Sequence, residues 1–440
     1  MFIVNVGRVV SRKFLLQMSW KNTYVCKNSL QKDVMKYFTH SVPSSLDTTA
    51  LYGKRTIREH LRYNMLLATF KANFGADGCC FASAPGRVEV IGNHTDHNGG
   101  SVIGATVDTD MLCAFARNKN GVVHIKNKGR ADVVFALDDI DNVEPGSIGM
   151  VKGVLSYLRL QGYNVDGFNA VLDSKIPSGA GLSSGAALQV LVGCVVNALY
   201  NDGKIPAETL AKAGQYAENK YFGKPCGLLD QGAIALGGIV AMDFACGFTY
   251  SRFPSILTDY NLVVVNTGGS HAPLTALYAQ IPKDMEAVAK FFGKERLCEV
   301  EPSHFYGDYE NVCRCVGERQ AKRAKHFFDE CDRVAQMKVA LQSGDQHDFV
   351  RLVNESGDSS MNLLGNCSYD GNSAIKDAVC MARKICPDGA ARVHGGGFAG
   401  TVLCVVPKNK CVRFLLDMSM NYGPDNVRKL SVRSCGACVL

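Results

Sequence analysis

Residues 85–100 hold the densest group of side chains in this chain that could do chemistry on a polar ligand. The segment reads Pro-Gly-Arg-Val-Glu-Val-Ile-Gly-Asn-His-Thr-Asp-His-Asn-Gly-Gly, so an arginine, two histidines, two asparagines and an aspartate lie between glycines. A hydrophobic core would not take this mixture, and a plain surface loop would not need it. Polar groups that converge between glycine turns suit a ligand with many hydroxyls, because each hydroxyl needs both a donor and an acceptor.

A second segment, residues 176–187, predicts an anion-binding turn between a strand and a helix. Gly179 and Gly181 let backbone amides approach an anion closely. Ser183 and Ser184 lie where the first helical turn leaves N–H groups unpaired at the positive end of the helix dipole. The loop lacks the lysine of Walker A, and its third glycine comes one residue too late for the dinucleotide fingerprint. A helix capped by Ser183 or Ser184 after a tight turn is the structural alternative.

The composition is that of an ordinary globular protein. The chain has 440 residues, of which 47% are hydrophobic and 20% charged, and this length allows two or three domains. The formal charge is +7 with Lys and Arg scattered, so we expect no nucleic-acid partner. No apolar run approaches the length of a membrane span, so we expect no membrane partner. Many of the 18 cysteines lie in apolar segments, which predicts reduced thiols in a cytoplasmic protein.

Two cysteine pairs and the N-terminal region leave alternatives open. The pairs Cys313/Cys315 and Cys435/Cys438 could each be half of a zinc site, but no second pair at finger-like spacing follows either one. The first 32 residues contain six Lys or Arg and no Asp or Glu. This charge is typical of an organellar presequence, but also of a disordered start or an over-long reading frame, and we favour the last two.

Hydrophobic periodicity predicts a chain of mixed α and β structure. We expect helices over 56–74, 188–199, 283–292, 319–341 and 373–385. We expect strands over 88–91, 101–115, 122–125, 133–137, 171–176, 262–265 and 402–406. The chain shows no internal repeat and no low-complexity linker. We place a domain boundary near residue 250 because it divides the chain evenly.

Three motifs together resemble the GHMP kinases, which include galactokinase, homoserine kinase, mevalonate kinase and phosphomevalonate kinase. Residues 86–100 resemble the galactokinase signature Gly-Arg-Val-Asn-Leu-Ile-Gly-Glu-His-Thr-Asp-Tyr-Asn-Gly-Gly. Residues 177–187 resemble the ATP-phosphate motif, and residues 393–401 resemble the C-terminal glycine-rich loop. The order and separation of the motifs match, and the resemblance runs from about residue 51 to about residue 407.

The resemblance implies a two-domain α+β GHMP kinase fold with the active site in the cleft between the domains. We expect an N-terminal extension over 1–45, an N-terminal domain over 46–250 and a C-terminal domain over 251–440. The implied activity is that of a sugar 1-kinase that uses ATP and Mg²⁺ to phosphorylate the anomeric hydroxyl of galactose, the first step of galactose utilisation. The partner would be a small sugar, and we expect a monomer.

Matching positions give the site that the resemblance implies. Arg87 would stabilise charge at the reacting centre, and Asp230 would lie near the attacking hydroxyl. Sugar contacts are expected from Asn93, His94, Asp96, Gly227 and Tyr278. ATP contacts are expected from Gly179, Ala180, Gly181, Leu182, Ser183, Ser184, Gly185 and Gly396, with Ser184 also binding magnesium. Without the resemblance, Asp230 would be a helix-start or surface carboxylate, His394 a structural histidine and Tyr278 as easily a packing aromatic.

Departures from the family's pattern at Asn93, His97 and Gly185 bear on the sugar and on magnesium. Asn93 stands where most galactokinases have glutamate, and His97 replaces the usual tyrosine. Because asparagine donates as well as accepts, the choice of sugar is open, with N-acetylgalactosamine as the alternative to galactose. Gly185 stands where the family usually has a third serine whose hydroxyl helps bind magnesium. The rival hypothesis is therefore a non-catalytic regulator that binds sugar and ATP, which the presence of Arg87 and Asp230 opposes.

Overall fold

The computed structural model describes residues 36–42, 48–53, 57–177, 179–223, 226–268 and 274–440. Most of the expected N-terminal extension lies outside these residues. Its described part, residues 36–42, packs onto the protein: Phe38 forms an antiparallel bridge with Cys79, and the side chains of Phe38 and Val42 are buried.

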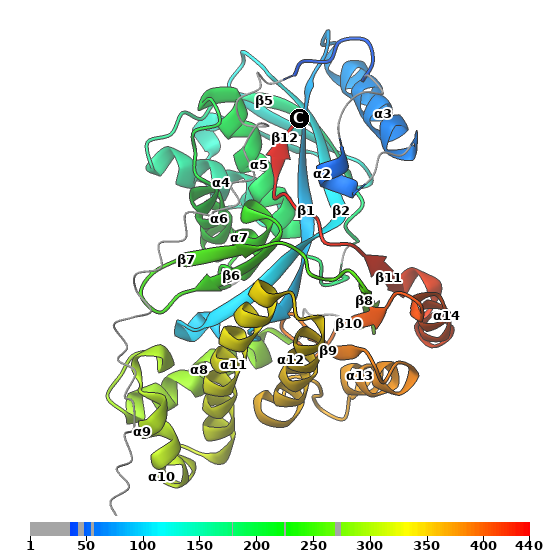
Figure 1. The fold of residues 1–440 in the computed structure, drawn as a ribbon. Coiled ribbons are helices and arrows are strands. Elements are labelled where there is room, and N and C mark those ends of the chain that lie inside the picture. Colours follow the sequence, from blue (N-terminus) through cyan, green and yellow to red (C-terminus); the bar gives the residue numbers. More distant parts are fainter. Residues whose placement is uncertain (1–35, 43–47, 54–56, 178, 224–225, 269–273) are drawn as a thin grey trace, which may run out of the picture.

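The larger of two sheets has eight strands in the order β12-β1-β2-β5-β3-β4, with β6 pairing β2 and β7 pairing β6. All neighbours run antiparallel except β3 and β5. The strands are β1 Cys80–Ile91, β2 Ser101–Arg117, β3 Val122–Asn127, β4 Val133–Ala136, β5 Phe168–Ser174, β6 Ile239–Asp243, β7 Thr249–Phe253 and β12 Cys438–Val439. The long strands β1 and β2 form the centre of this sheet (Figure 1).

Helices cover both faces of the larger sheet (Figure 1). Along β2, Cys113 and Phe115 belong to the core under α4 and α5, whereas Leu112 and Ala114 belong to the core under α3. This alternation follows from the two-residue period of a strand. The helices of this part are α2 Thr49–Tyr52, α3 Ile57–Phe74, α4 Gly146–Leu160, α5 Ser184–Tyr200, α6 Ala207–Tyr216 and α7 Leu229–Leu236.

The smaller sheet has four antiparallel strands in the order β11-β8-β10-β9. They are β8 Tyr260–Asn266, β9 Ala390–His394, β10 Thr401–Pro407 and β11 Val427–Leu430. Helices α12 Gln346–Ser359, α13 Ala374–Ile385 and α14 Cys411–Tyr422 contact this sheet. Helices α8 Thr275–Phe291, α9 Pro302–Gly307, α10 Tyr309–Cys315 and α11 Glu318–Ser343 form the lower part of the molecule in Figure 1.

Short 3-10 and π turns complete the described secondary structure. They are η1 Asp96–Asn98, η2 Leu137–Asp139, η3 Ala217–Tyr221, η5 Leu297–Glu299, η6 Ser360–Leu364 and η7 Pro424–Asn426. The turns η3 and η6 are π-helical and directly continue α6 and α12. Single π turns inside helices often accompany functional sites.

The predicted α+β class is confirmed, and most predicted elements are found, with differences in their extent. The strand expected over 88–91 is longer, because β1 begins at Cys80. Pro85 and Gly86 interrupt the apolar pattern, and the register against β2 shifts between Pro85 and Arg87. Such a bulge accommodates an irregular residue and re-aims the side chains beside it. The domain boundary near 250 stays a prediction: β7 ends at Phe253 in the larger sheet, and β8 opens the smaller one.

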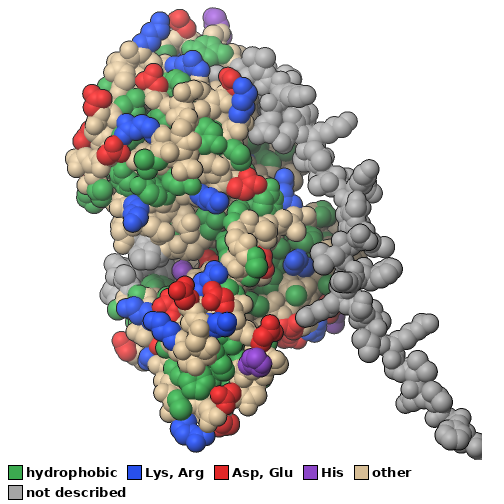
Figure 2. Space-filling model, turned by 90° about the vertical axis from the view of Figure 1, so that its left-hand side faces the viewer, with side chains coloured by type: hydrophobic (Ala, Val, Ile, Leu, Met, Phe, Trp, Pro, Cys, Tyr) green, Lys and Arg blue, Asp and Glu red, His purple; other side chains and the backbone are tan. Residues whose placement is uncertain are grey.

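The described cysteines give no sign of a disulfide or a metal site. The cysteines there are free thiols, and no described group of three or more His, Cys, Asp and Glu could hold a metal ion. None of the described helices is both long and apolar enough to span a bilayer. Figure 2 shows acidic and basic side chains interspersed on one face, with apolar side chains between them.

A buried ionic cluster ties α3 to the larger sheet. Arg62 Nη1 donates to Asp110 Oδ1 at 2.6 Å, and Ser83 Oγ donates to Asp110 Oδ2 at 2.5 Å. Burial alone would raise the pKa of the Asp110 carboxyl, but Arg62 and Arg433 outweigh it and hold that pKa below its ordinary value. Asp110 is 0% exposed. Removal of its charge would therefore deprive the Arg62 guanidinium of this buried ion pair.

We therefore expect Asp110→Asn to lower the free energy of unfolding by about 3 kcal/mol at neutral pH, measured by urea unfolding. The control is Asp388→Asn, whose ion pair with Lys410 is exposed and should contribute nothing measurable. A carboxyl whose pKa is depressed by folding stabilises the protein above its unfolded pKa, and this contribution is lost in acid. The difference between Asp110→Asn and wild type should therefore shrink as the pH falls, and equal midpoints at pH 7 would contradict the prediction.

Candidate active site

The three sequence motifs line one cleft of about 530 Å³. Its walls are the end of β1, the turn η1, the loop before α5, the start of α7, part of α8 and the loop after β9. Every predicted site residue lines this cleft except Ala180, which lines a smaller cavity next to it. The fold thus brings together residues that are widely separated in the sequence.

An arginine–aspartate pair forms the centre of the cleft. Arg87 Nε donates to Asp230 Oδ1 at 2.7 Å, and Arg87 Nη2 lies 2.6 Å from Asp230 Oδ2. Arg87 also donates to the carbonyl of Gly181, and Ser183 Oγ donates to Asp230. The Arg87 side chain is 7% exposed and that of Asp230 is 35% exposed. The guanidinium is therefore fixed from several sides while the carboxylate stays accessible from the cleft.

The loop before α5 fits a polyphosphate. Gly179 and Gly181 have φ of +73° and +72°, and Ser183 adopts φ 57° just before the helix begins at Ser184. Within the described residues no side chain caps this helix, because the hydroxyl of Ser183 turns to Asp230 instead. The structural alternative, a helix capped by Ser183, is thus not found. The first-turn N–H groups and the positive end of the α5 dipole face the cleft and, in the described part of the chain, receive no cap from the Ser183 side chain, which suits an anion site.

Two buried polar atoms face the same loop. His394 Nε2 accepts a hydrogen bond from the Glu89 N–H at 3.0 Å, so the neutral ring carries its proton on Nδ1. Burial, with Arg87 and Arg392 nearby, lowers the pKa of His394 well below its ordinary value. In the described structure, His394 Nδ1 and Thr401 Oγ1 have no hydrogen-bond partner. A Cβ at Gly181 would lie 3.0 Å and 2.8 Å from these atoms, so only glycine fits beside them.

His94 holds the third motif against the first, and Tyr278 holds the third motif against α8. His94 Nε2 lies 2.9 Å from the Gly396 carbonyl, and Tyr278 OH donates to the Gly397 carbonyl at 2.7 Å. Burial, followed by the neighbouring His97, lowers the pKa of His94 to about 3. His94 is therefore neutral at physiological pH and donates through Nε2. Both predicted sugar-binding side chains have a hydrogen bond to the glycine-rich loop.

Asn93 is bound on all sides by protein groups. Its Nδ2 donates to Glu89 Oε1 at 2.9 Å and to the Gly395 carbonyl at 2.8 Å, which uses both amide hydrogens. Its Oδ1 accepts from Asn366 Nδ2 at 2.8 Å, and its side chain is 1% exposed. A sugar could reach this amide only by displacing one of these partners. In this arrangement Asn93 joins β1 to the third motif.

Gly227 approaches Asp96 rather than open space. A Cβ added at Gly227 would lie 1.6 Å from Asp96 Oδ2. The other carboxylate oxygen, Asp96 Oδ1, is 3.6 Å from His97 Nε2. The Gly227 backbone therefore lies against the carboxylate that is expected to hold a sugar hydroxyl, and its predicted contact with the sugar stays a prediction.

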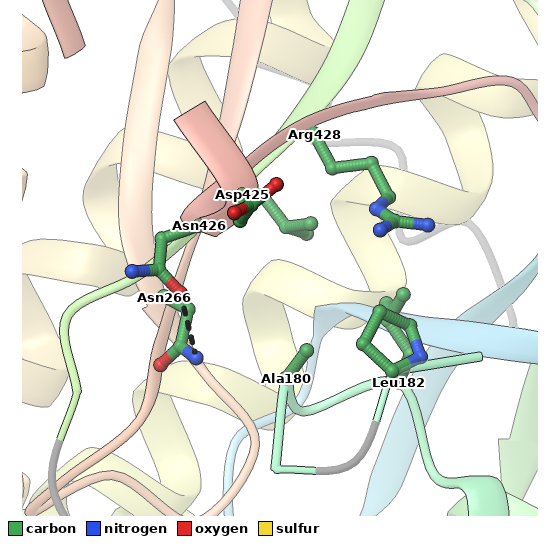
Figure 3. A pocket seen from close by; sticks show the side chains of 8 residues that line it. Ala180, Leu182, Asn266, Asp425, Asn426 and Arg428 are labelled. Carbon is green, nitrogen blue, oxygen red and sulfur yellow. Dashed lines mark hydrogen bonds between the residues drawn. The ribbon is translucent and has the colours of Figure 1, made fainter. Parts of the chain in front are cut away.

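A smaller cavity of about 100 Å³ lies behind the phosphate loop (Figure 3). Ala180 and Leu182 face residues near the edge of the smaller sheet across this space. Asn266 Nδ2 donates to Asn426 Oδ1 at 3.4 Å on the far side. The phosphate loop thus has the cleft on one side and the smaller sheet on the other.

Two family models match this chain. The GHMP kinases N-terminal domain matches residues 149–238, and the galactokinase galactose-binding signature matches residues 68–117. The galactokinase of Glaesserella parasuis serovar 5 (strain SH0165) is 30% identical over 359 residues, which covers 80% of this chain and 92% of that protein. The chain belongs to the galactokinase family. The galactokinase of Clostridium tetani (strain Massachusetts / E88) is similar at 29% identity over 374 residues, with 83% and 93% of the two chains covered.

Solved structures agree with this family. The Lactococcus lactis galactokinase complexed with galactose superposes with a TM-score of 0.76 at 26% identity, covering 87% of this chain and 99% of that one. The Methanococcus jannaschii mevalonate kinase superposes with a TM-score of 0.56 at 16% identity over 80% of this chain and 98% of its own, which shows the shared fold. The predicted GHMP kinase fold and galactokinase family are thereby confirmed. The roles of single residues stay predictions.

Several residues of this galactokinase-family cleft were missed in the sequence. Glu89 lies within the first motif, where the galactokinase signature has asparagine, and it binds the buried Arg392 at 2.7 Å. His394 and Thr401 border the glycine run of the third motif, and their unpaired atoms could not be foreseen from it. Glu218 lines the cleft from η3, in a segment without any motif.

The contact between Gly227 and Asp96 can be tested by Gly227→Ala. The added methyl group must displace the Asp96 carboxylate, so we expect the KM for the sugar to rise about tenfold or more with the fold retained. Gly307→Ala is the control, because nothing lies within 4 Å of a Cβ at that position. An unchanged KM in the Gly227 variant would show that Asp96 does not need its present position.

Proposed function

We propose that this protein transfers the γ-phosphoryl group of ATP to the anomeric hydroxyl of galactose, giving ADP and galactose 1-phosphate. The ion pair between Arg87 and Asp230 carries this proposal. It lies where the sugar signature, the phosphate loop and the start of α7 meet. A non-catalytic binding protein would have no need for a bidentate, partly accessible pair at that point.

The pair suits phosphoryl transfer, which depends on positioning and charge stabilisation more than on covalent chemistry. Asp230 accepts or orients the proton of the attacking hydroxyl, because its carboxylate is open to the cleft. Arg87 holds that carboxylate in one orientation through two hydrogen bonds and offers positive charge beside the reacting phosphoryl group. Its bond to the Gly181 carbonyl fixes the phosphate loop relative to the base.

The residues of the loop fit the phosphates of ATP. The backbone of 179–185 and the N-terminal end of α5 supply amide donors, and His394 Nδ1 and Thr401 Oγ1 are two further donors close to Gly181. Mg²⁺, when bound, neutralises phosphate charge. Ser184 and Glu218 are the oxygen-bearing side chains of the cleft that would hold it beside the phosphates.

The sugar occupies the part of the cleft lined by His94, Asp96, Gly227 and Tyr278. Asn93 acts on the choice of sugar through its neighbours, because its own amide is fully bonded. Galactose is the substrate that the family favours, and N-acetylgalactosamine is the alternative to include in a panel.

One observation favours a second function, a regulator that binds sugar and ATP without transferring phosphate. Gly185 offers no side-chain oxygen, and no described cluster of three acidic, His or Cys side chains compensates for it. This function predicts saturable sugar binding without ADP release.

The base can be tested with Asp230→Asn, which keeps the size of the side chain. We expect kcat for ADP release with galactose and Mg²⁺ to fall about 10³-fold while sugar affinity, measured by calorimetry, changes little. Asp243→Asn, on β6 outside the cleft lining, is the matched control. Equal turnover in Asp230→Asn would remove Asp230 from the mechanism. Wild-type protein that binds sugar but releases no ADP on any sugar would instead support the regulator.

The missing magnesium ligand can be tested with Gly185→Ser. The position has room, because among the described residues an added Cβ would meet only Met150, at 3.4 Å and 3.6 Å. We expect the half-saturating Mg²⁺ concentration to fall about tenfold, which corresponds to about 1.4 kcal/mol. Gly185→Ala adds the same Cβ without the hydroxyl and should leave the Mg²⁺ requirement unchanged. An equal effect of both substitutions would exclude a role for the hydroxyl.

A further inference from the structure

The last eight residues return to the larger sheet and carry two thiols three positions apart. Cys438 and Val439 pair with Ser83 and Ala82 of β1, and the Leu440 N–H donates to the Phe81 carbonyl at 2.9 Å. In Figure 1 this red strand, β12, lies beside β1 with α5 and α2 around it. Cys435 precedes the strand in the bend Cys-Gly-Ala-Cys.

One buried guanidinium contacts both thiols. Arg433 Nε donates to Cys435 Sγ at 3.4 Å, and Arg433 Nη2 donates to Cys438 Sγ at 3.5 Å. Arg433 is 1% exposed and is held in place by Ser83 Oγ, which accepts from Nη1 at 2.8 Å. Two sulfurs on adjacent nitrogens of one fixed guanidinium lie close to each other.

The two thiols are chemically unequal. The hydrogen bond from Cys438, with the help of Arg433, outweighs burial and lowers the pKa of Cys435 to about 6. The same hydrogen bond and burial raise the pKa of Cys438 well above its ordinary value. The other titratable groups around the pair are Asp110 on β2, Tyr63 on α3 and Cys194 on α5. A half-buried thiolate next to a neutral thiol is the arrangement of a nucleophilic and a resolving cysteine.

The bend between the thiols rests on the helix that carries Asp230. A Cβ at Gly436 would lie 2.7 Å from the Ile234 carbonyl and 2.4 Å from the Ala235 carbonyl, so the backbones touch. The Ala437 N–H also donates to the Ile234 carbonyl at 2.8 Å. Helix α7 has only eight residues, and Asp230 is in its first turn. A movement of the bend would therefore displace the C-terminal end of this short helix.

We propose that Cys435 and Cys438 are a redox-active dithiol whose oxidation to an intramolecular disulfide slows phosphoryl transfer through α7. The slowing rests on the proposed kinase function; the formation of the disulfide does not. With a peroxide as oxidant, the Cys435 thiolate attacks one oxygen, the O–O bond breaks, and hydroxide leaves to give a sulfenic acid. The sulfur of Cys438 then attacks Cys435, loses its proton and releases water. Two thiols and one hydrogen peroxide thus give one disulfide and two waters.

We expect formation of the disulfide to move the bend. Its sulfurs must approach to about 2 Å, so the hydrogen bonds from Arg433 to the two thiols must rearrange. The backbone of Gly436 cannot shift without displacing the end of α7, because the two are already in contact. A displacement of about 1 Å at a catalytic group can lower turnover about 100-fold, so even a fraction of that movement at Asp230 would be measurable.

The modification is tested on the full chain without reference to activity. The reduced protein is treated with hydrogen peroxide, alkylated and digested, and the C-terminal peptide is analysed by mass spectrometry. We expect a peptide that lacks two hydrogens, resists alkylation and is restored by dithiothreitol. Oxidation confined to other cysteines, or sulfinic acid at Cys435 without a disulfide, would overturn the proposal.

The effect on turnover is tested with Cys435→Ser and Cys438→Ser, each compared with Cys380→Ser, which removes an exposed thiol on α13. In wild type and Cys380→Ser, peroxide should lower kcat about tenfold in a form that dithiothreitol reverses. Both serine variants of the pair should lose this reversible component. Identical, reversible inactivation in all four proteins would overturn the link to α7. If untreated wild type releases no ADP, the proposed kinase function fails, while peptide mapping still decides the disulfide.

The pH dependence separates this pair from an ordinary surface thiol. The rate of disulfide formation should rise with pH through about 6 and level off near neutrality, because it follows the Cys435 thiolate. A rate that keeps rising through about pH 8.5, as for a free cysteine, would contradict a thiolate stabilised by Arg433. Arg433→Met, if folded, should shift the midpoint upward.

Discussion

The ion pair between Arg87 and Asp230 is the interaction on which the rest of this structure depends. Arg87 lies on a bulged part of β1, and Asp230 lies in the first turn of α7, a helix too short to be stable without its neighbours. The pair is made only if β1, α7 and the phosphate loop are all in place, since Arg87 binds Gly181 and Ser183 binds Asp230. The arrangement of these contacts is therefore complete only when all three elements are folded together.

Backbone strain gathers at the same place. The described residues include five non-glycine positions with positive φ, and His94, Ser183 and Phe398 each lie in one of the three motifs. Such conformations cost about 1–3 kcal/mol each and persist only where the surroundings impose them. The surroundings here are buried ionic groups: Glu89 binds Arg392, and Glu330 accepts from the Gly92 N–H at 2.8 Å. Burial of these charged groups costs free energy, yet their ion pair and hydrogen bond are the contacts that hold the motifs in these conformations.

The family, the fold class and many of the cleft residues could be predicted from the sequence, because three motifs together resemble those of one family. The orientation of single side chains could not. Asn93 lies in the first motif, yet its amide is used by Glu89, Gly395 and Asn366, two of which come from distant segments. Helix α7 was missed because its sequence, Leu-Asp-Gln-Gly-Ala-Ile-Ala-Leu, has no clear amphipathic period. The residues of β12 do not themselves predict that it joins the larger sheet. Its two residues form a strand only because they can pair with the edge of β1.

The part of the cleft that we expect to bind the sugar (the sugar half) and the part that we expect to bind phosphate (the phosphate half) differ in how many of their polar groups already have hydrogen-bond partners. In the sugar half, His94, Asn93 and Tyr278 have protein partners, so the hydroxyls of a ligand meet a network that is already shaped. In the phosphate half, α5 has no side-chain cap, and His394 Nδ1 and Thr401 Oγ1 have no partner within the described structure. Unpaired buried donors cost about 1–3 kcal/mol each, and an anion removes that cost when it binds. The phosphate half therefore gains most from its ligand, whereas the sugar half selects its ligand by shape. A substitution at Asn93 should then act on the sugar by moving Glu89 and Gly395, not by losing a direct contact.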